Sequence, residues 1–113
     1  MSDKTNTVPA EIANRFKDLN SDLQATLKKV SELEDDARDH ARVISTLEEL
    51  GPDRRCFRLV GDVLVERTQP EILEAVKLNR QQLLEIAGKF NTHSKDVEKE
   101  MQEIETKYAV REN

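Results

Sequence analysis

Two histidines and one cysteine are the side chains of this sequence that could ligate a metal or take part in catalysis. Cys56 stands between Arg55 and Phe57, and no nearby cysteine or histidine completes the spacing of a metal site. One cysteine cannot form an intrachain disulfide, so we expect an ordinary reduced thiol; a redox-sensing role would require a stabilised thiolate. His40 and His93 lie far apart in the sequence, so a shared site depends on how the chain folds.

The composition favours an elongated helical protein over a thick globule. The chain has 113 residues, of which 36% are charged and 4% aromatic, and its mean hydropathy is -0.73. Eighteen basic and 23 acidic side chains give a net charge of -5, which argues against a nucleic-acid partner. The longest apolar run is Val63–Val65, whereas a membrane span needs about 18 residues. The N-terminus lacks the layout of a secretory signal, so we expect a cytoplasmic protein.

Two long segments carry a heptad repeat, in which apolar residues recur in alternating steps of four and three. In the first segment the repeat, with two polar exceptions, consists of Ile12, Phe16, Leu19, Leu23, Thr26, Val30, Leu33, Ala37, His40, Ile44 and Leu47. In the second, which has one irregular step from Val97 to Met101, it consists of Ile72, Val76, Asn79, Leu83, Ile86, Phe90, His93, Val97, Met101, Ile104 and Tyr108. The repeats predict helices over 9–50 and 70–110; Gly51-Pro52 ends the first, and a capping box from Thr68 to Glu71 opens the second.

The two repeats match each other as an antiparallel pair. Facing residues in such a pair have position numbers that sum to a constant, and all eleven pairs sum to 119 or 120. The polar exceptions also pair, Thr26 with His93 and His40 with Asn79. The histidines then lie 14 positions apart along the pair, roughly 20 Å, so they cannot share an ion. We therefore expect polar layers that fix the register, with no metal site and no cofactor.

The connecting segment 54–68 has the pattern of a β-hairpin. Gly61-Asp62 suits a tight turn, so Val60 would face Val63 and Leu59 would face Leu64. Both faces of this hairpin are apolar near the turn, and a lone two-stranded ribbon has two open edges. Packing against its own helices could cover only one face, so we expect the hairpin to mediate oligomerisation. The residues assigned to this role are Phe57, Leu59, Val60, Val63, Leu64 and Val65.

A helix, a single hairpin and a matched helix together resemble the β-type subunits of the prefoldin family. The specific part is the run 55–68, which reads RCFRLVGDVLVERT, and the resemblance covers nearly the whole chain. It implies a mainly α fold, an antiparallel two-helix coiled coil whose hairpin joins an inter-subunit β-barrel. The whole chain, 1–113, would form a single domain.

The resemblance also implies a function, that of a subunit in an ATP-independent, hetero-hexameric chaperone. Such a complex holds unfolded clients, actin and tubulin, at its coiled-coil tips and delivers them to the cytosolic chaperonin. Partners would be other α-type and β-type subunits, unfolded clients and the chaperonin. The end layers of the coiled coil, which have frayable ends, are assigned to client binding: Val8, Ile12, Phe16, Ile104, Tyr108 and Val110.

An enzyme and a structural adaptor are the two other functional classes to compare with a chaperone subunit. An enzyme would need a pocket that excludes water, and a serine on a two-helix coil has none, so we expect no catalytic activity. A structural adaptor remains an alternative, since a coiled coil could oligomerise through its hairpin and bind one folded partner. Capture of several unrelated unfolded proteins would distinguish the chaperone from the adaptor.

Overall fold

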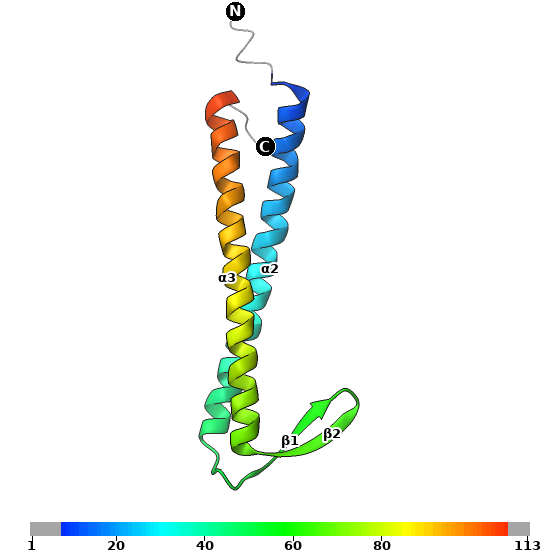
Figure 1. Ribbon diagram of the computed structural model, residues 1–113, viewed down its shortest axis with the longest axis vertical. Helices are drawn as coiled ribbons and strands as arrows, with labels where there is room; N and C mark the ends of the chain where they lie inside the picture. The colour runs from blue at the N-terminus through cyan, green and yellow to red at the C-terminus, as the bar shows by residue number, and fades with distance from the viewer. Residues whose placement is uncertain (1–7, 109–113) are drawn as a thin grey trace, which may run out of the picture. The chain divides into compact units, whose positions relative to one another are not determined.

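The computed structural model describes residues 8–108 and contains two long helices with a hairpin between them (Figure 1). The elements are α2 (Ala10–Glu48), β1 (Arg55–Val60), β2 (Val63–Thr68) and α3 (Gln69–Tyr108). The predicted arrangement of helix, hairpin and helix is therefore confirmed. The described residues form two compact units, unit 1 within Met1–Ser31 and Gly88–Asn113, and unit 2 in Glu32–Ala87.

Local sequence signals set the ends of the helices. Pro9 precedes α2, and its carbonyl accepts hydrogen bonds from the N–H groups of Ile12 and Ala13, both at 3.0 Å. At the other end the Leu50 N–H donates to the Leu47 carbonyl at 3.1 Å, a tighter turn than that of an α-helix. This tightening ends α2 at Glu48, two residues before the predicted limit.

The predicted capping box opens α3. The Thr68 N–H donates to the Glu71 carboxylate at 3.2 Å, and the Glu71 N–H donates to the Thr68 hydroxyl at 3.3 Å. The Thr68 hydroxyl also donates to Glu71 Oε1 at 2.9 Å, and these bonds from Thr68 lower the pKa of the Glu71 carboxyl. The cap thus converts the end of a strand directly into the first turn of a helix.

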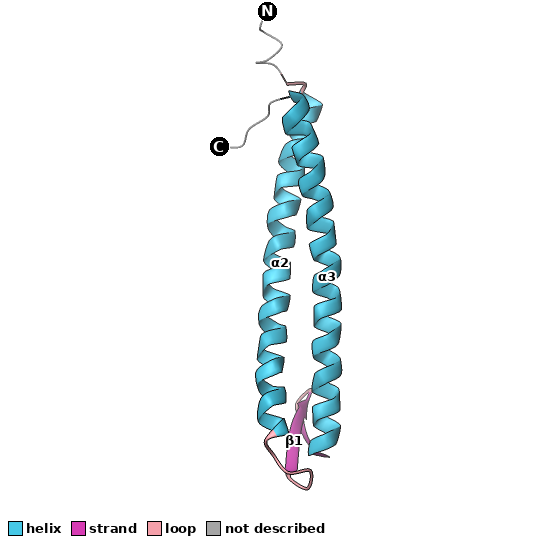
Figure 2. Cartoon of the chain, turned by 90° about the vertical axis from the view of Figure 1, so that its left-hand side faces the viewer, coloured by secondary structure: helices cyan, strands magenta, loops and turns pink. Residues whose placement is uncertain are grey.

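Unit 1 has an apolar cluster between its stretches of α2 and α3, which run side by side (Figure 2). We call it the unit 1 cluster. Its buried members are Phe16, Leu19, Val97 and Met101, with Leu23 and Ile104 packed partly buried against them. Three predicted facing pairs, whose numbers all sum to 120, thus meet in one cluster. Each helix covers the apolar stripe of the other.

Two predicted seam positions in α3 are wrong. Ile86 is 43% exposed and His93 is also exposed, whereas the next residues, Ala87 and Ser94, are buried. Small side chains also line the opposite helix, where Ala37 is 1% exposed, so close approach of the backbones selects them over larger neighbours. The irregular step of the repeat therefore lies at Leu83 and not between Val97 and Met101.

Three of the four side chains in the predicted polar pairs, those of Thr26, His93 and His40, bond to other residues instead. The Thr26 hydroxyl donates to Asp22 Oδ1 at 3.1 Å, and His93 Nε2 lies 2.9 Å from Asp22 Oδ2. His40 Nδ1 instead lies 2.8 Å from the Asp36 carbonyl of its own helix. Asp22, which the repeat leaves outside the seam, bridges the two residues that were expected to touch.

In unit 2, two side chains of α3 donate hydrogen bonds to backbone carbonyls of α2. Gln69, a buried residue, donates from Nε2 to the Leu47 carbonyl at 2.7 Å. Arg80 donates from Nε to the Ala37 carbonyl at 3.3 Å. The Gln69 bond gives a second donor to the Leu47 carbonyl, which also accepts from the Leu50 N–H, at the point where the hairpin joins α3.

The unit 1 cluster predicts a large difference between two leucines of α2. Leu19→Ala removes a side chain that is 3% exposed and should cost about 2–5 kcal/mol of stability. Leu27→Ala is the matched control, because Leu27 is 42% exposed, and should cost less than about 0.5 kcal/mol. Thermal unfolding followed by far-UV circular dichroism checks both. Equal losses in the two variants would contradict the assignment of the core.

Candidate functional site

The hairpin has the predicted register. β1 and β2 pair antiparallel, with Val60 opposite Val63, Leu59 opposite Leu64 and Phe57 opposite Glu66. Gly61 has a φ of 60°, in the left-handed region that the first position of a primed turn requires. The turn therefore fixes which side chains share a face.

The hairpin exposes most of its large apolar side chains. Phe57, Leu59, Val60, Val63 and Leu64 are between 55% and 67% exposed, and Val65 is half-buried. Within the described chain the sheet has only these two strands, so the outer edge of each lacks a strand partner. Exposed apolar faces next to open edges are features that associating strands use.

The two faces of the hairpin have different surroundings. Val60 and Val65 line a shallow pocket with Ile72 and Ala75 of α3, so this face turns toward the first turns of the helix. The other face carries Phe57, Leu59 and Leu64. Packing against the chain's own helix therefore covers only part of one face.

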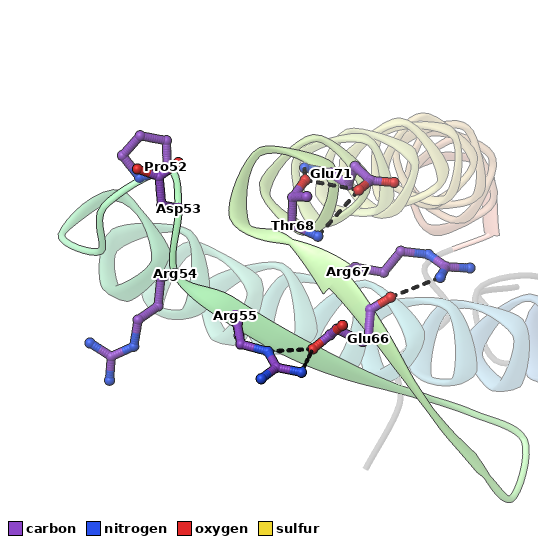
Figure 3. Close-up of a pocket in the computed structure, with 8 residues that line it drawn as sticks. All are labelled: Pro52, Asp53, Arg54, Arg55, Glu66, Arg67, Thr68 and Glu71. Carbon is purple, nitrogen blue, oxygen red and sulfur yellow. Dashed lines mark hydrogen bonds and ion pairs between the residues drawn. The ribbon is translucent and has the colours of Figure 1, made fainter.

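Charged residues organise the base of the hairpin (Figure 3). Arg55 Nε donates to Glu66 Oε1 at 2.6 Å across the two strands, and Arg67 Nη1 donates to the Glu66 carbonyl at 2.9 Å. The residues that line the open pocket here are Pro52, Asp53, Arg54, Arg55, Glu66, Arg67, Thr68 and Glu71. Their hydrogen bonds with one another fix the strand against the start of α3, so we assign this pocket a structural role.

The residues assigned to client binding differ in exposure. Val8, Ile12, Ile104 and Tyr108 are half-buried, whereas Phe16 is 6% exposed within the unit 1 cluster. Val110 lies outside the described residues. Contact between a client and Phe16 would therefore require the two helices to separate locally, while the other four already present part of their surface.

Two pairs of polar side chains, one of them an ion pair, connect α2 and α3 in unit 1. Arg15 contacts the Glu100 carboxylate through two nitrogens, at 2.7 and 3.0 Å, and His93 contacts Asp22 at 2.9 Å. The hydrogen bond from His93 lowers the pKa of the Asp22 carboxyl, and the hydrogen bond from Arg15 lowers that of Glu100. The sequence reading missed these pairs. Part of their signal is in the sequence, where Arg15, Asp22 and Glu100 each stand one position before a predicted seam residue. His93 gave no such signal, because the repeat placed it in the seam itself.

Metal and membrane features can be assessed for the described residues. Between residues 8 and 108 no group of three or more His, Cys, Asp or Glu side chains is placed to hold a metal ion. His40 belongs to unit 2 and His93 to unit 1. No helix in this part of the chain is long and apolar enough to span a membrane.

A likeness in structure supports the fold. A crystal structure titled as the prefoldin beta subunit from Thermococcus strain KS-1 superposes with a TM-score of 0.79, covering 95% of this chain and 98% of that one. The two sequences are 16% identical, so this likeness concerns the fold alone.

Sequence comparisons give the family. The chain is 35% identical to a probable prefoldin subunit 2 of Dictyostelium discoideum over 101 residues, which span 89% of this chain and 87% of that protein. It is 35% identical to prefoldin subunit 2 of Homo sapiens over 96 residues, 85% of this chain and 62% of the human protein. The profile of a family described as "Prefoldin subunit" matches residues 10–111. The chain therefore belongs to the prefoldin subunit family.

Proposed function

We propose that this chain is one subunit of an ATP-independent, hetero-hexameric chaperone that holds unfolded proteins. The observation that carries the proposal is the hairpin, which combines five exposed large apolar side chains with two open strand edges. Membership of the prefoldin subunit family supports a chaperone role for such an assembly. The proposal assigns the chain no catalytic step.

The hairpin is the surface through which the subunit assembles. Its apolar side chains would leave water between neighbouring subunits, and its edges would gain backbone hydrogen bonds from neighbouring strands in a β-barrel. The residues proposed for this interface are Phe57, Leu59, Val60, Val63, Leu64 and Val65. Pairing along both edges requires neighbours on both sides, which suits a closed ring of α-type and β-type subunits.

The end layers of unit 1 are the surface that contacts clients. Ile12 and Tyr108 have one partner helix and keep part of their apolar surface in water, which an extended unfolded chain could cover. Val8 and Ile104 extend this surface, and Phe16 joins it when the helices separate. Val110, outside the described residues, completes the proposed set. Actin and tubulin are the proposed clients, and the cytosolic chaperonin is the proposed recipient in the cytoplasm.

Assembly through the hairpin predicts a specific loss. Leu59→Asp places a charge on an exposed apolar face, so we expect the tagged chain to lose its partner subunits in native mass spectrometry of the complex purified from its own cytosol. Leu78→Asp is the matched control, because Leu78 is 53% exposed on α3. It should retain all partners. Loss of the partner subunits in both variants, or in neither, would contradict the assignment of the hairpin as the interface. Recovery of the wild-type chain with one large folded partner would favour the structural adaptor.

Client capture predicts a second, separate loss. The double variant Ile12→Ser and Tyr108→Ser removes apolar surface from the end layers and should weaken suppression of aggregation of two unrelated unfolded proteins several-fold. Leu27→Ser, an exposed position in the same unit, serves as the control and should act like the wild type. Light scattering measures aggregation, and native mass spectrometry verifies that assembly is unchanged. Undiminished suppression would place client binding elsewhere, and a wild type that suppresses nothing would favour the adaptor.

A further inference from the structure

The Arg15–Glu100 and Asp22–His93 pairs of unit 1 lie on one flank of the apolar cluster. Arg15 and Asp22 are seven residues apart on α2, and His93 and Glu100 are seven apart on α3, so the pairs occupy equivalent positions in successive heptads. We call these two pairs the latch. Because each pair joins α2 to α3, separating the helices on this flank must break both.

The latch surrounds residues of the unit 1 cluster. One open pocket of unit 1 is lined by Arg15, Asp18, Leu19, Asp22, His93, Asp96, Val97 and Glu100. Two of these, Leu19 and Val97, are buried members of the cluster, and the other six are the ionisable groups around them. The flank that the latch closes is therefore a direct route to the apolar core that holds Phe16.

The strength of the latch is limited, which suits a reversible contact. Exposed ion pairs are weak because water and salt screen them, although the two-nitrogen geometry of the Arg15–Glu100 pair is the stronger kind of contact. Both of its side chains are partly exposed, so salt can screen the pair. Breaking it would change the population of opened helices by a small factor and would not unfold the protein.

We propose that the latch gates client access, by holding α2 and α3 together over the unit 1 cluster until the pairs break. This inference rests on the proposed client-binding function. Opening exposes Phe16 and its neighbours, and closure returns them to the seam. Arg15, Asp22, His93 and Glu100 are thus positioning residues that control exposed apolar area without contacting the client.

Hydrogen–deuterium exchange of the full chain in its native complex tests the latch directly. Arg15→Met should raise the exchange rate of amides around Phe16 and Met101 about 1.5- to 5-fold. Lys17→Met is the matched control. Lys17 lies two residues after Arg15 and outside the latch, so this variant removes the same charge and should leave exchange unchanged. Raising salt from about 0.1 M to about 1 M should speed exchange in the wild type but little in Arg15→Met. The exchanged pair Arg15→Glu with Glu100→Arg should restore protection.

The outcomes separate the latch from the proposed function. Equal exchange in Arg15→Met and Lys17→Met overturns the latch. Faster exchange with stronger suppression of client aggregation supports it, whereas faster exchange without that gain, in a complex whose wild type does capture clients, overturns gating. A wild type that captures no client refutes the proposed function and, with it, gating. Hydrogen–deuterium exchange of the variants then still decides whether the two pairs hold the helices together.

Acid provides an independent test of the same contacts. The pKa of Asp22 is lowered from its ordinary value of 3.8, chiefly by His93, and that of Glu100 from 4.5 by Arg15. A lowered pKa means that the carboxylate stabilises the folded state above its ordinary pKa and loses this effect as pH falls through the lowered value. Opening, measured as exchange corrected for the intrinsic effect of pH, should therefore rise between about pH 5 and about pH 2.

The double variant Asp22→Asn and Glu100→Gln removes both carboxylates of the latch. It should exchange faster than the wild type at neutral pH and respond less to acid, with Asp18 and Asp96 left as the remaining carboxyls of this flank. The control, Glu98→Gln, lies outside that pocket and should keep the wild-type response. A double variant with the full wild-type response to acid would overturn the role of these carboxylates.

Discussion

The packing of α2 against α3 is the interaction on which the rest of the structure depends. Each helix has one apolar stripe and one partner to cover it, so neither stripe is buried unless the chain reverses direction between them. The hairpin provides that reversal, and the cap from Thr68 to Glu71 converts its second strand into α3 without a loop. A two-helix pair buries less surface than a globular core, which leaves its end layers partly exposed.

Because a two-helix pair buries little surface, two apolar surfaces have no partner within the described part of this chain. The hairpin is too small to cover itself, and its side chains stay in water although they are the most apolar part of the sequence. The end layers of unit 1 are only half-buried because each has one neighbour. The proposed function uses the hairpin for stable association with other subunits and the end layers for transient contact with clients. In the proposed gating, the Arg15–Glu100 and Asp22–His93 pairs add a weak contact that competes with client binding.

The seam residues show which facing pairs apolar spacing predicts correctly and which it does not. Apolar spacing identified the pairs around Leu19 and Leu23, because the residues next to these leucines in the sequence are polar and do not compete for the seam position. It selected Ile86 and His93 where the seam uses Ala87 and Ser94. Sums of 119 and 120 are both consistent with an antiparallel pair, so they do not distinguish neighbouring residues. Hydrophobicity ranks isoleucine above alanine, although the structure buries Ala87 and exposes Ile86.

The sequence by itself determined the two helices, their antiparallel pairing and the hairpin register, because heptad spacing, a capping box and a Gly-Asp turn are local signals that act through backbone geometry. Only the tertiary structure decided that Asp22 bridges Thr26 and His93, that Gln69 bonds to the Leu47 carbonyl, and that Arg15 meets Glu100. Those contacts join side chains outside the seam, whose partners depend on the separation and rotation of the helices. Hydrophobic periodicity does not specify the separation or the rotation of the helices closely enough to predict which atoms bond.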